Sequence, residues 1–275
     1  MRRVLVAVGG TFVEARPQVQ GIVALRLAVG NVLGHGGALP DTGAVLLADV
    51  AWWSASAAIY VGNGLSDLVG DRRNGSLRPL AAGRLRVADA ESAVVVLVGV
   101  ALLSGAATGL GAVLAVAAFL VLGGAYSSGP RPLKERAAGA SVTAGAAGAA
   151  TPLFGALSVH GQLTGQVVVV ASVLGLWMLV AGNAKDFGDE PGDRLAGRRT
   201  LPLVLGPARA RRVLSVGVLV VGVLAVILAG AWPGVRSLAL LGGAAVLMVA
   251  AWRLPADRGA TRGRPTGCSC GARSW

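Results

Sequence analysis

The chain has 275 residues, of which 54% are hydrophobic and only 14% are charged. Soluble globular domains carry about 25% charged residues, so the composition excludes an ordinary soluble domain, and the low charge also excludes a disordered chain. In a soluble protein, the formal net charge of +12 would suggest a nucleic-acid partner. Here the positions of the basic residues along the sequence provide a different explanation.

The first 16 residues form a short basic and apolar segment. Like a signal peptide, it begins with arginines, Arg2 and Arg3, and continues with an apolar stretch. That stretch is short, however, and Glu14 and Arg16 follow it at once. We therefore predict that residues 1–16 are a cytoplasmic N-terminal segment or an interfacial helix, and not a cleaved leader.

Residues 17–253 consist of long apolar runs separated by short polar connections. With their flanks, these runs reach the roughly 20 residues that a helix needs to cross a bilayer. The sequence therefore predicts an all-α fold, a polytopic transmembrane helical bundle with about eight spans. The predicted spans cover residues 17–35, 42–63, 88–105, 108–126, 138–158, 165–184, 213–232 and 236–253.

The basic residues alternate with these spans. All but two of the 25 Lys and Arg residues lie in segments that the span order places on one side of the membrane. The exceptions are Arg26, within the first span, and Arg236, on the opposite side. The positive-inside rule places the basic side in the cytoplasm. Because this topology accounts for the positive charge, we predict a multi-pass protein of the cell membrane and no nucleic-acid partner.

One predicted span and the C-terminal tail differ from the rest in composition. Residues 137–150 contain eight Ala and three Gly, and in lipid such small residues let helix backbones approach closely. Almost nothing polar accompanies them, so helix packing explains them better than a pore lining does. Residues 254–275 are rich in Arg and Gly and have no apolar period, which predicts a disordered tail.

The first group of acidic residues lies at the cytoplasmic end of the second predicted span. Asn63, Asp67 and Asp71 follow an i, i+4, i+8 spacing. On a helix this spacing stacks the three side chains along one face.

The second group lies at the end of the sixth predicted span. Asp186, Asp189 and Asp193 follow an i, i+3, i+7 spacing, which again gives one face if the helix continues. Pro191 and the glycines beside it predict a break in the helix before Asp193.

Carboxylates at the C-terminal end of a helix are electrostatically unfavourable, because that end is already negative. A bound cation would offset this cost, and Mg²⁺ is the natural candidate since it binds carboxylate oxygens together with substrate phosphates. The alternative is a solvated loop in which Arg72, Arg73 and Arg194 neutralise the acidic groups. One cluster alone would fit either interpretation, but two clusters at equivalent positions of two helices favour the metal.

Basic side chains accompany both acidic groups on the same predicted side of the membrane. They suit phosphate oxygens, because arginine presents a fork of donors and lysine a compact charge. Each one alone is explained by topology, but together with the carboxylates they indicate a diphosphate held by metal and base. These residues are Arg78, Lys134, Lys185, Arg194 and Arg198.

Three ordered segments resemble the signatures of the UbiA family of intramembrane prenyltransferases. Residues 63–83 resemble the first signature, with N-x3-D-x3-D-R-x-N followed by R-P-L and Gly83. Residues 185–202 resemble the second, with K-D-x2-D-x3-D-R followed by G-R-x-T-L-P. Residues 126–134, Y-S-x2-P-x2-L-K, are similar to the tyrosine–lysine segment of the branch that contains chlorophyll synthase, tocopherol-type and archaeal lipid prenyltransferases. The resemblance covers about residues 14–253.

The resemblance implies a helical bundle around a central cavity that opens sideways to lipid, with Mg²⁺ bound to a prenyl diphosphate. The implied catalytic residues are the four metal-binding aspartates Asp67, Asp71, Asp189 and Asp193. Asn63 would share one ion with Asp67 and Asp71, and Asp186 is either a further ligand or a helix-end partner of Lys185. Lys134 and Arg194 would contact the diphosphate, and Tyr126 would lie beside it. With the basic residues that accompany the acidic groups, the predicted diphosphate-binding residues are Arg72, Arg78, Tyr126, Lys134, Lys185, Arg194 and Arg198. Family members usually have nine spans, and the ninth would lie within residues 255–275.

The charged and aromatic residues within the spans each have a functional and a structural interpretation. Arg26 either reaches the diphosphate, or an acidic group of the acceptor, or pairs with Asp49 in the second span. Aromatic faces can stabilise a carbocation, although a place in the membrane–water interface is the commoner role for Trp, Trp177 excepted. The aromatic residues on the spans that carry the motifs are Trp52, Trp53, Tyr60, Trp177 and Phe187.

The function predicted from these residues is Mg²⁺-dependent transfer of a prenyl group from an isoprenoid diphosphate to an acceptor. The expected partners are the prenyl diphosphate, a small-molecule acceptor, foremost an aromatic or quinone precursor, and membrane lipid. Two alternatives use the same site: transfer to a glycerol-phosphate lipid, and intramolecular cyclisation to a terpene. A third alternative, from a different class, is a non-catalytic transporter.

Overall fold

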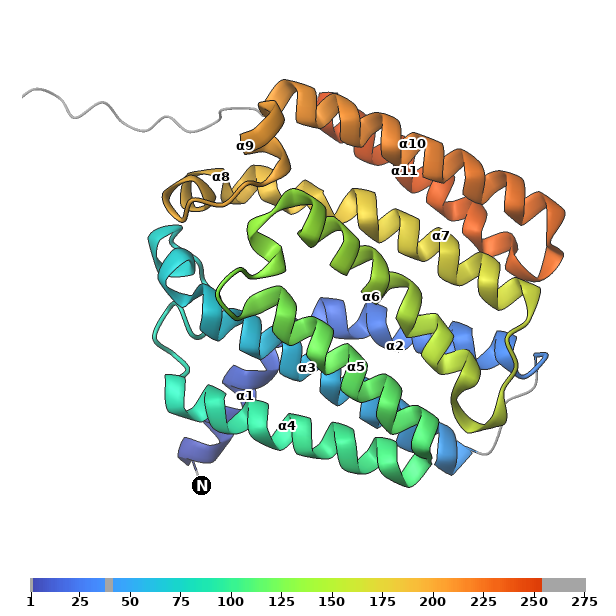
Figure 1. The fold of residues 1–275 in the computed structure, drawn as a ribbon, viewed down its shortest axis with the longest axis horizontal. Coiled ribbons are helices and arrows are strands. Elements are labelled where there is room, and N and C mark those ends of the chain that lie inside the picture. Colours follow the sequence, from blue (N-terminus) through green and yellow to red (C-terminus); the bar gives the residue numbers. More distant parts are fainter. Residues whose placement is uncertain (1, 38–41, 254–275) are drawn as a thin grey trace, which may run out of the picture.

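The computed structural model describes residues 2–37 and 42–253, and within these ranges it is helical with no β-strand (Figure 1). The helices lie side by side as a bundle, with their connections gathered at its two ends (Figure 1). Their bounds are α1 Arg2–Glu14, α2 Pro17–Gly34, α3 Thr42–Arg73, α4 Val87–Thr108, α5 Leu110–Ser127, α6 Ala137–Leu157, α7 Gly165–Ala181, α8 Asp186–Leu195, α9 Leu201–Leu205, α10 Pro207–Ala231 and α11 Ala239–Arg253.

Each of the eight predicted spans contains a long helix, from α2 to α7 and then α10 and α11. Seven of these helices are long and apolar enough to cross a membrane by their length and composition. The remaining one, α2, is less apolar, and its polar residues Gln20 and Asn31 are buried inside the bundle. The predicted all-α, polytopic transmembrane bundle is therefore confirmed.

The N-terminal segment is helical as α1, which exposes apolar side chains such as Val4, Leu5 and Phe12. Its location in the membrane interface stays a prediction. The predicted disordered tail, residues 254–275, where other family members would have a ninth span, lies outside the described residues.

The small residues of α6 allow neighbouring helices to approach closely, as predicted. A methyl group added to Gly148 would lie 2.9 Å from the carbonyl oxygen of Leu174 on α7. One added to Gly155 would lie 2.4 Å from the carbonyl oxygen of Leu27 on α2. These distances leave no room for a side chain, so α6 packs between α2 and α7 through its glycines.

Candidate active site

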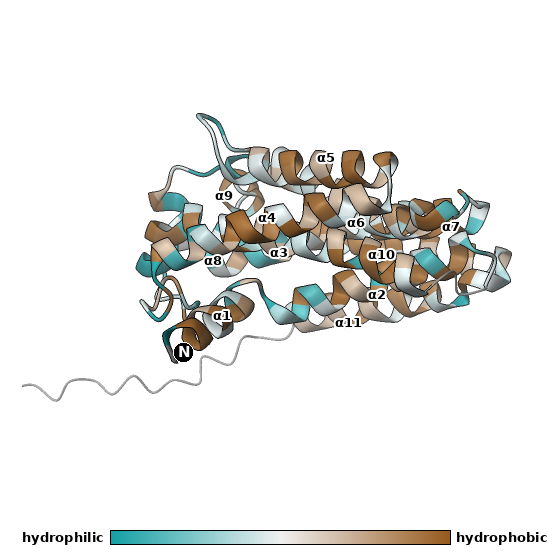
Figure 2. Cartoon of the chain, turned by 90° about the horizontal axis from the view of Figure 1, so that it is seen from below, coloured by the Kyte–Doolittle hydropathy of each residue, from teal (hydrophilic) through white to brown (hydrophobic). Residues whose placement is uncertain are grey.

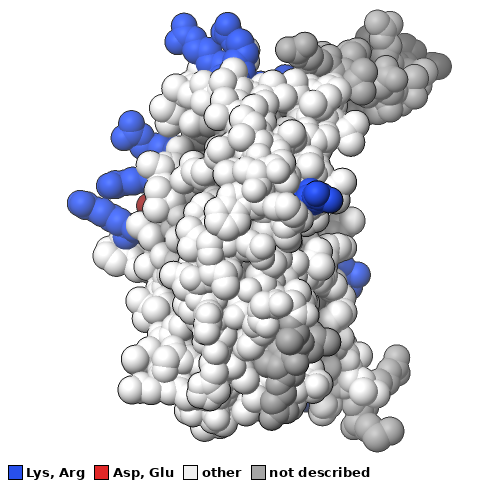
Figure 3. All heavy atoms as spheres, turned by 90° about the vertical axis from the view of Figure 1, so that its right-hand side faces the viewer, with Lys and Arg blue, Asp and Glu red and all other residues white. Residues whose placement is uncertain are grey.

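The two acidic motifs lie at the same end of the bundle. The end of α3, the connection between α5 and α6, and the helices α8 and α9 all meet there, on the left of Figure 1. Hydrophilic residues gather at this end, whereas the sides of the long helices are largely hydrophobic (Figure 2). The end turned toward the viewer in Figure 3 is the opposite one, and the Lys and Arg side chains in view there stand mostly along its margins.

Helix α3 presents the first motif by continuing beyond its apolar part to Arg73. The amide nitrogen Nδ2 of Asn63 donates a hydrogen bond to Oδ2 of Asp67 at 3.0 Å, so these two side chains share one face as their spacing predicts. Asp71 follows one turn later, and its Oδ2 lies 3.0 Å from Nη1 of Arg78.

Helix α8 presents the second motif as one continuous helix from Asp186 to Leu195. The predicted break before Asp193 is therefore wrong. The irregular turn comes earlier, in the 3-10 helix η3, Gly182–Lys185. There the amide of Asn183 donates to the carbonyl oxygens of Leu179 and Val180, at 2.8 and 3.2 Å. These bonds satisfy backbone acceptors at the end of α7, so the helix can end before the motif begins.

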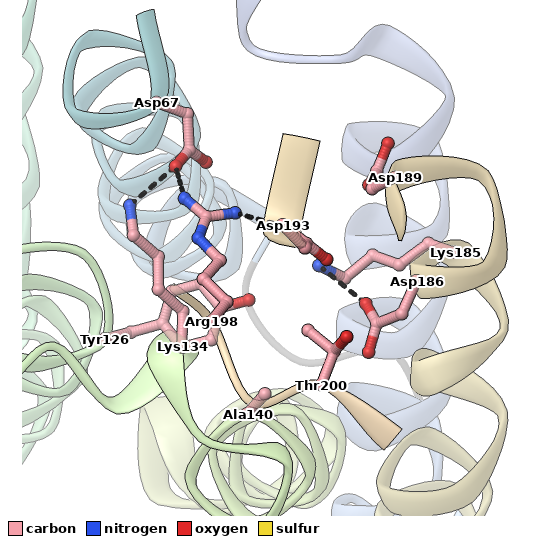
Figure 4. A pocket seen from close by; sticks show the side chains of 10 residues that line it. All are labelled: Asp67, Tyr126, Lys134, Ala140, Lys185, Asp186, Asp189, Asp193, Arg198 and Thr200. Carbon is pink, nitrogen blue, oxygen red and sulfur yellow. Dashed lines mark hydrogen bonds and ion pairs between the residues drawn. The ribbon is translucent and has the colours of Figure 1, made fainter. Parts of the chain in front are cut away.

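Arg198 joins the two motifs directly. Its Nη2 forms an ion pair with Oδ1 of Asp67 on α3, and its Nη1 lies 3.0 Å from Oδ1 of Asp193 on α8. The backbone also brings the motifs together, because a methyl group on Gly192 would lie 2.3 Å from the side-chain amide of Asn74. Two carboxylates far apart in sequence are thus held on either side of one guanidinium (Figure 4).

Lys134 is the second cation between the motifs. It lies on the 3-10 helix η1, Leu133–Glu135, is buried, and places Nζ 2.9 Å from Oδ1 of Asp67 and 2.5 Å from Oγ of Ser66. A backbone bond fixes η1 against the segment after α8, since Arg199 N–H donates to the Glu135 carbonyl at 2.7 Å. The tyrosine–lysine segment and the second motif are therefore positioned together.

These groups line a single pocket (Figure 4). It receives residues from α3, α5, η1, α6, η3, α8 and the segment before α9. The carboxylates of α8 lie across it from Asp67, and Nζ of Lys185 is 3.6 Å from Oδ1 of Asp186. The lining residues are Asp67, Tyr126, Lys134, Ala140, Lys185, Asp186, Asp189, Asp193, Arg198 and Thr200.

Burial and charge pairing act against each other on the groups in the connections. Burial lowers the pKa of Lys134, although the carboxylate of Asp67 acts in the opposite direction. Burial raises the pKa of Asp193, although Arg198 opposes this effect. Burial would also lower the pKa of Arg198, but the two carboxylates beside it outweigh burial and raise that pKa. The guanidinium therefore stays charged in a site that could bind an anion.

Comparison with known proteins identifies the family of this chain. A sequence model of the UbiA prenyltransferase family matches residues 23–266. The chain belongs to this family. The predictions of a UbiA-family resemblance and of an integral-membrane prenyltransferase are thereby confirmed. No curated protein matches the sequence.

Solved UbiA structures share the fold. A UbiA homolog from Archaeoglobus fulgidus bound to GPP and Mg²⁺ has a TM-score of 0.73 at 18% identity, covering 93% of this chain and 91% of that one. The structure of that homolog bound to DMAPP and Mg²⁺ has a TM-score of 0.71 at 19% identity, covering 88% and 86%. A structure of digeranylgeranylglyceryl phosphate synthase has a TM-score of 0.64 at 18% identity, covering 89% and 86%.

Several predicted site residues of this UbiA prenyltransferase lie outside the pocket. Arg72 is exposed at the end of α3. Arg194 is also exposed and pairs with Glu190 on α8 at 3.0 Å. Among the described residues, Arg26 makes no ion pair with Asp49, whose Oδ1 instead accepts a hydrogen bond from Asn31 at 3.2 Å. Asp71 and Arg78 bind each other beside the pocket.

Thr200 is a pocket residue to which the sequence assigned no role. It is 4% exposed, and its Oγ1 is buried without a hydrogen-bond partner among the described residues. A buried hydroxyl without a partner is costly unless something binds it. The one available sequence signal is its place in the second motif, seven residues after Asp193.

Proposed function

We propose that this UbiA-family enzyme moves a prenyl group from an isoprenoid diphosphate to a lipid-soluble acceptor in a Mg²⁺-dependent reaction. The pocket carries this proposal. Asp67 on α3 faces Asp189 and Asp193 on α8 across it, with Lys134 and Arg198 between them. Carboxylates for a metal and cations for a diphosphate therefore line one pocket.

The donor set fits Mg²⁺ that shares its coordination with the substrate. Within the described ranges, no three Asp, Glu, His or Cys side chains converge closely enough to enclose an ion by themselves. Mg²⁺ is usually bound by one or two carboxylates together with phosphate oxygens and water, so a full protein cage is not needed. When bound, Mg²⁺ would neutralise charge on the departing diphosphate.

The proposed ligands come from both motifs. Asn63 and Asp67 would serve one ion, with Asp71 one turn further along α3. Asp189 and Asp193 would serve the other, with Asp186 beside them. All six present the hard oxygen donors that Mg²⁺ prefers.

The cations and hydroxyls of the pocket would bind the diphosphate. Lys134, Lys185 and Arg198 can donate charge-assisted hydrogen bonds to its oxygens. The hydroxyls of Tyr126 and Thr200 provide two further donors at the same pocket. Lys134 and Arg198 are already held by Asp67, so their positions are set before the substrate arrives.

In the reaction, the allylic carbon–oxygen bond would break with its electron pair passing to the diphosphate. The cations of the pocket stabilise the negative charge that develops there. An electron-rich atom of the acceptor attacks the allylic carbocation, and the acceptor then loses a proton to a motif carboxylate or to the released diphosphate. The two histidines are not used, since His35 and His160 lie at the opposite end of the bundle. The apolar helices keep water from the carbocation.

The acceptor is proposed to be an aromatic or quinone precursor, and a membrane assay tests this. Purified protein in liposomes would receive Mg²⁺, then DMAPP, GPP or a longer prenyl diphosphate, with an aromatic acceptor, a glycerol-phosphate lipid or no acceptor. Pyrophosphate release that requires the aromatic acceptor supports the proposal. Release with the glycerol-phosphate lipid alone would identify that lipid as the acceptor instead. Release without any acceptor, together with a hydrocarbon product, would indicate intramolecular cyclisation. No release under any condition overturns the proposed function in favour of transport.

We also propose that the pocket faces the cytoplasm, because the positive-inside rule places the basic connections there. The test uses single cysteines in a variant whose two tail cysteines, Cys268 and Cys270, are replaced by Ser. Ser128→Cys lies at the pocket end and Leu163→Cys at the opposite end, and both positions are exposed. A membrane-impermeant thiol reagent added to intact cells should label only Leu163→Cys. Labelling of Ser128→Cys alone would show that the pocket faces the outside of the cell, which would contradict the proposed orientation.

A further inference from the structure

A buried ion pair lies beside the pocket, where α1 meets the connection between α3 and α4. Glu14, the last residue of α1, is fully buried, and its Oε1 lies 2.6 Å from Nη2 of Arg78. Its Oε2 accepts a hydrogen bond from the backbone N–H of Leu80 at 3.0 Å. Burying a carboxylate is costly unless its charge is paired, and here the pairing cation is Arg78. Oε1 makes this ion pair but has no hydrogen-bond partner among the described residues.

Arg78 links this pair to the first motif. Its Nη1 is 3.0 Å from Oδ2 of Asp71, and its Nη2 also donates to the backbone carbonyl of Tyr60 at 3.3 Å. The side chain is only 13% exposed. One guanidinium therefore holds a carboxylate of α1, a carboxylate of α3 and the backbone of α3 at the same time.

The surface of α3 is shaped to accept the pair. A methyl group on Gly64 would lie 2.3 Å from Oε1 of Glu14 and 2.6 Å from Nη2 of Arg78. Gly64 stands between Asn63 and Asp67 in the first motif, so the pair packs against the same helical turn that presents the motif.

We propose that Glu14 and Arg78 are positioning residues for the reaction, acting through Asp71. This inference rests on the proposed function, and it assigns Arg78 a role different from diphosphate binding. Asp71 shares the face of Asp67 and is directed by Nη1 of Arg78, while Glu14 and the Tyr60 carbonyl prevent Arg78 from turning into the pocket. The position of the Asp71 carboxylate beside the pocket is therefore set from α1, 57 residues earlier in the chain.

The alternative is that the pair only anchors α1 to the bundle. A measurement of metal binding distinguishes this anchoring role from the positioning of Asp71. The probe is Mn²⁺ with inorganic pyrophosphate, and binding to the purified protein is followed by electron paramagnetic resonance. Arg78→Lys keeps the charge but lacks the fork that contacts Glu14 and Asp71 together. Outer partners of metal ligands typically contribute tenfold or more to affinity, so Arg78→Lys should weaken Mn²⁺ binding about tenfold.

A double variant protects the test against simple unfolding. Glu14→Gln alone removes the fully buried one of the two carboxylates that pair with the Arg78 guanidinium, which can destabilise the whole protein. Glu14→Gln with Arg78→Gln removes both charges and should restore thermal stability, but Mn²⁺ binding should stay weak because Asp71 has lost its partner. Asp89→Asn is the matched control, since it breaks the pair of exposed Arg86 and partly exposed Asp89 at the start of α4 and should leave Mn²⁺ binding unchanged.

The outcomes distinguish this inference from the proposed function. If the wild type binds Mn²⁺ and Asp67→Asn abolishes binding, the metal site stands. If Arg78→Lys and the double variant then fold and bind Mn²⁺ like the wild type, the pair is only an anchor and the inference is overturned. If the wild type binds no Mn²⁺, the metal site itself fails, and the inference fails with it.

Discussion

At the end of the bundle that carries the two motifs, Asp67 faces Lys134 and Arg198, whereas at the opposite end Asp49 accepts a hydrogen bond from the neutral amide of Asn31. Both networks contain a carboxylate in a largely apolar bundle. Among the described residues, only the first combines carboxylates with cations, and its groups line a pocket. A buried polar group in such a bundle is a candidate for function. The comparison suggests a further criterion, which is whether the partners of that group are charged or neutral.

The network at the opposite end has the features of a structural element. Asn31 on α2 binds Asp49 on α3, and the hydroxyl of Ser158, after α6, donates to Oδ1 of Asn31 at 3.4 Å. The ring of His35 lies 2.8 Å from the carbonyl of Asn31 and 3.0 Å from that of Val159. These bonds join α2, α3 and the connection after α6, and the partner of Asp49 among them is a neutral amide.

Removing a motif carboxylate should give the largest effect in this comparison. Asp67→Asn keeps the shape of the side chain but removes the charge that holds Lys134, Arg198 and the proposed ion. We expect prenyl transfer to fall at least about a hundredfold, with a similar loss for Asp193→Asn. Pyrophosphate release in liposomes measures this loss, and Asp89→Asn serves as the control. Near wild-type turnover in both variants would contradict the assignment of the site.

Changing the guanidinium that joins the motifs should have the next largest effect. Arg198→Lys keeps a positive charge but cannot contact Asp67 and Asp193 with two separate nitrogens. We expect kcat/KM for the prenyl diphosphate to fall about tenfold or more, because the loss of a hydrogen bond to a charged group costs about 1.5–3 kcal/mol. Steady-state kinetics at saturating Mg²⁺ test this. An unchanged kcat/KM would mean that Arg198 only bridges the helices.

A smaller effect is expected at Thr200. Thr200→Val removes the buried hydroxyl and nearly preserves the shape, whereas Thr200→Ser keeps the hydroxyl. Because Oγ1 has no partner among the described residues, the substitution to Val should not lower the thermal stability. If the hydroxyl donates to the diphosphate, kcat/KM should fall about tenfold in the Val variant and recover in the Ser variant. Equal loss in both variants would indicate a packing role instead.

The sequence was sufficient to predict relations within one helix, but not the contacts between helices. The i, i+4 spacing of Asn63 and Asp67 was sufficient to predict their shared face, because that relation lies within one helix. The split of the basic residues predicted which connections lie together. Neither pattern could predict that Arg198 bridges the motifs, because that contact depends on how α3 and α8 pack.

Other expectations failed or stayed open because they also depend on how the helices pack against one another. An interfacial place was the commoner expectation for Trp52, yet it is buried and stacks on Phe119 and Phe154, with ring centroids 4.3 and 4.4 Å away. Those partners belong to α5 and α6, so no local pattern reports them. The pairing of Glu14 with Arg78 is equally non-local, because it depends on how α1 lies against α3.

The smallest effect is expected at the end of the bundle away from the pocket. Asp49→Asn removes a carboxylate from a span, but the new amide oxygen can still accept the hydrogen bond from Asn31. We expect turnover within about twofold of the wild type, since no cation or pocket group depends on this side chain in the described part of the chain. The same pyrophosphate assay, together with thermal unfolding in detergent, tests this. A loss comparable to that of Asp67→Asn would mean that the two networks are coupled, and the difference in their partners would no longer separate function from packing.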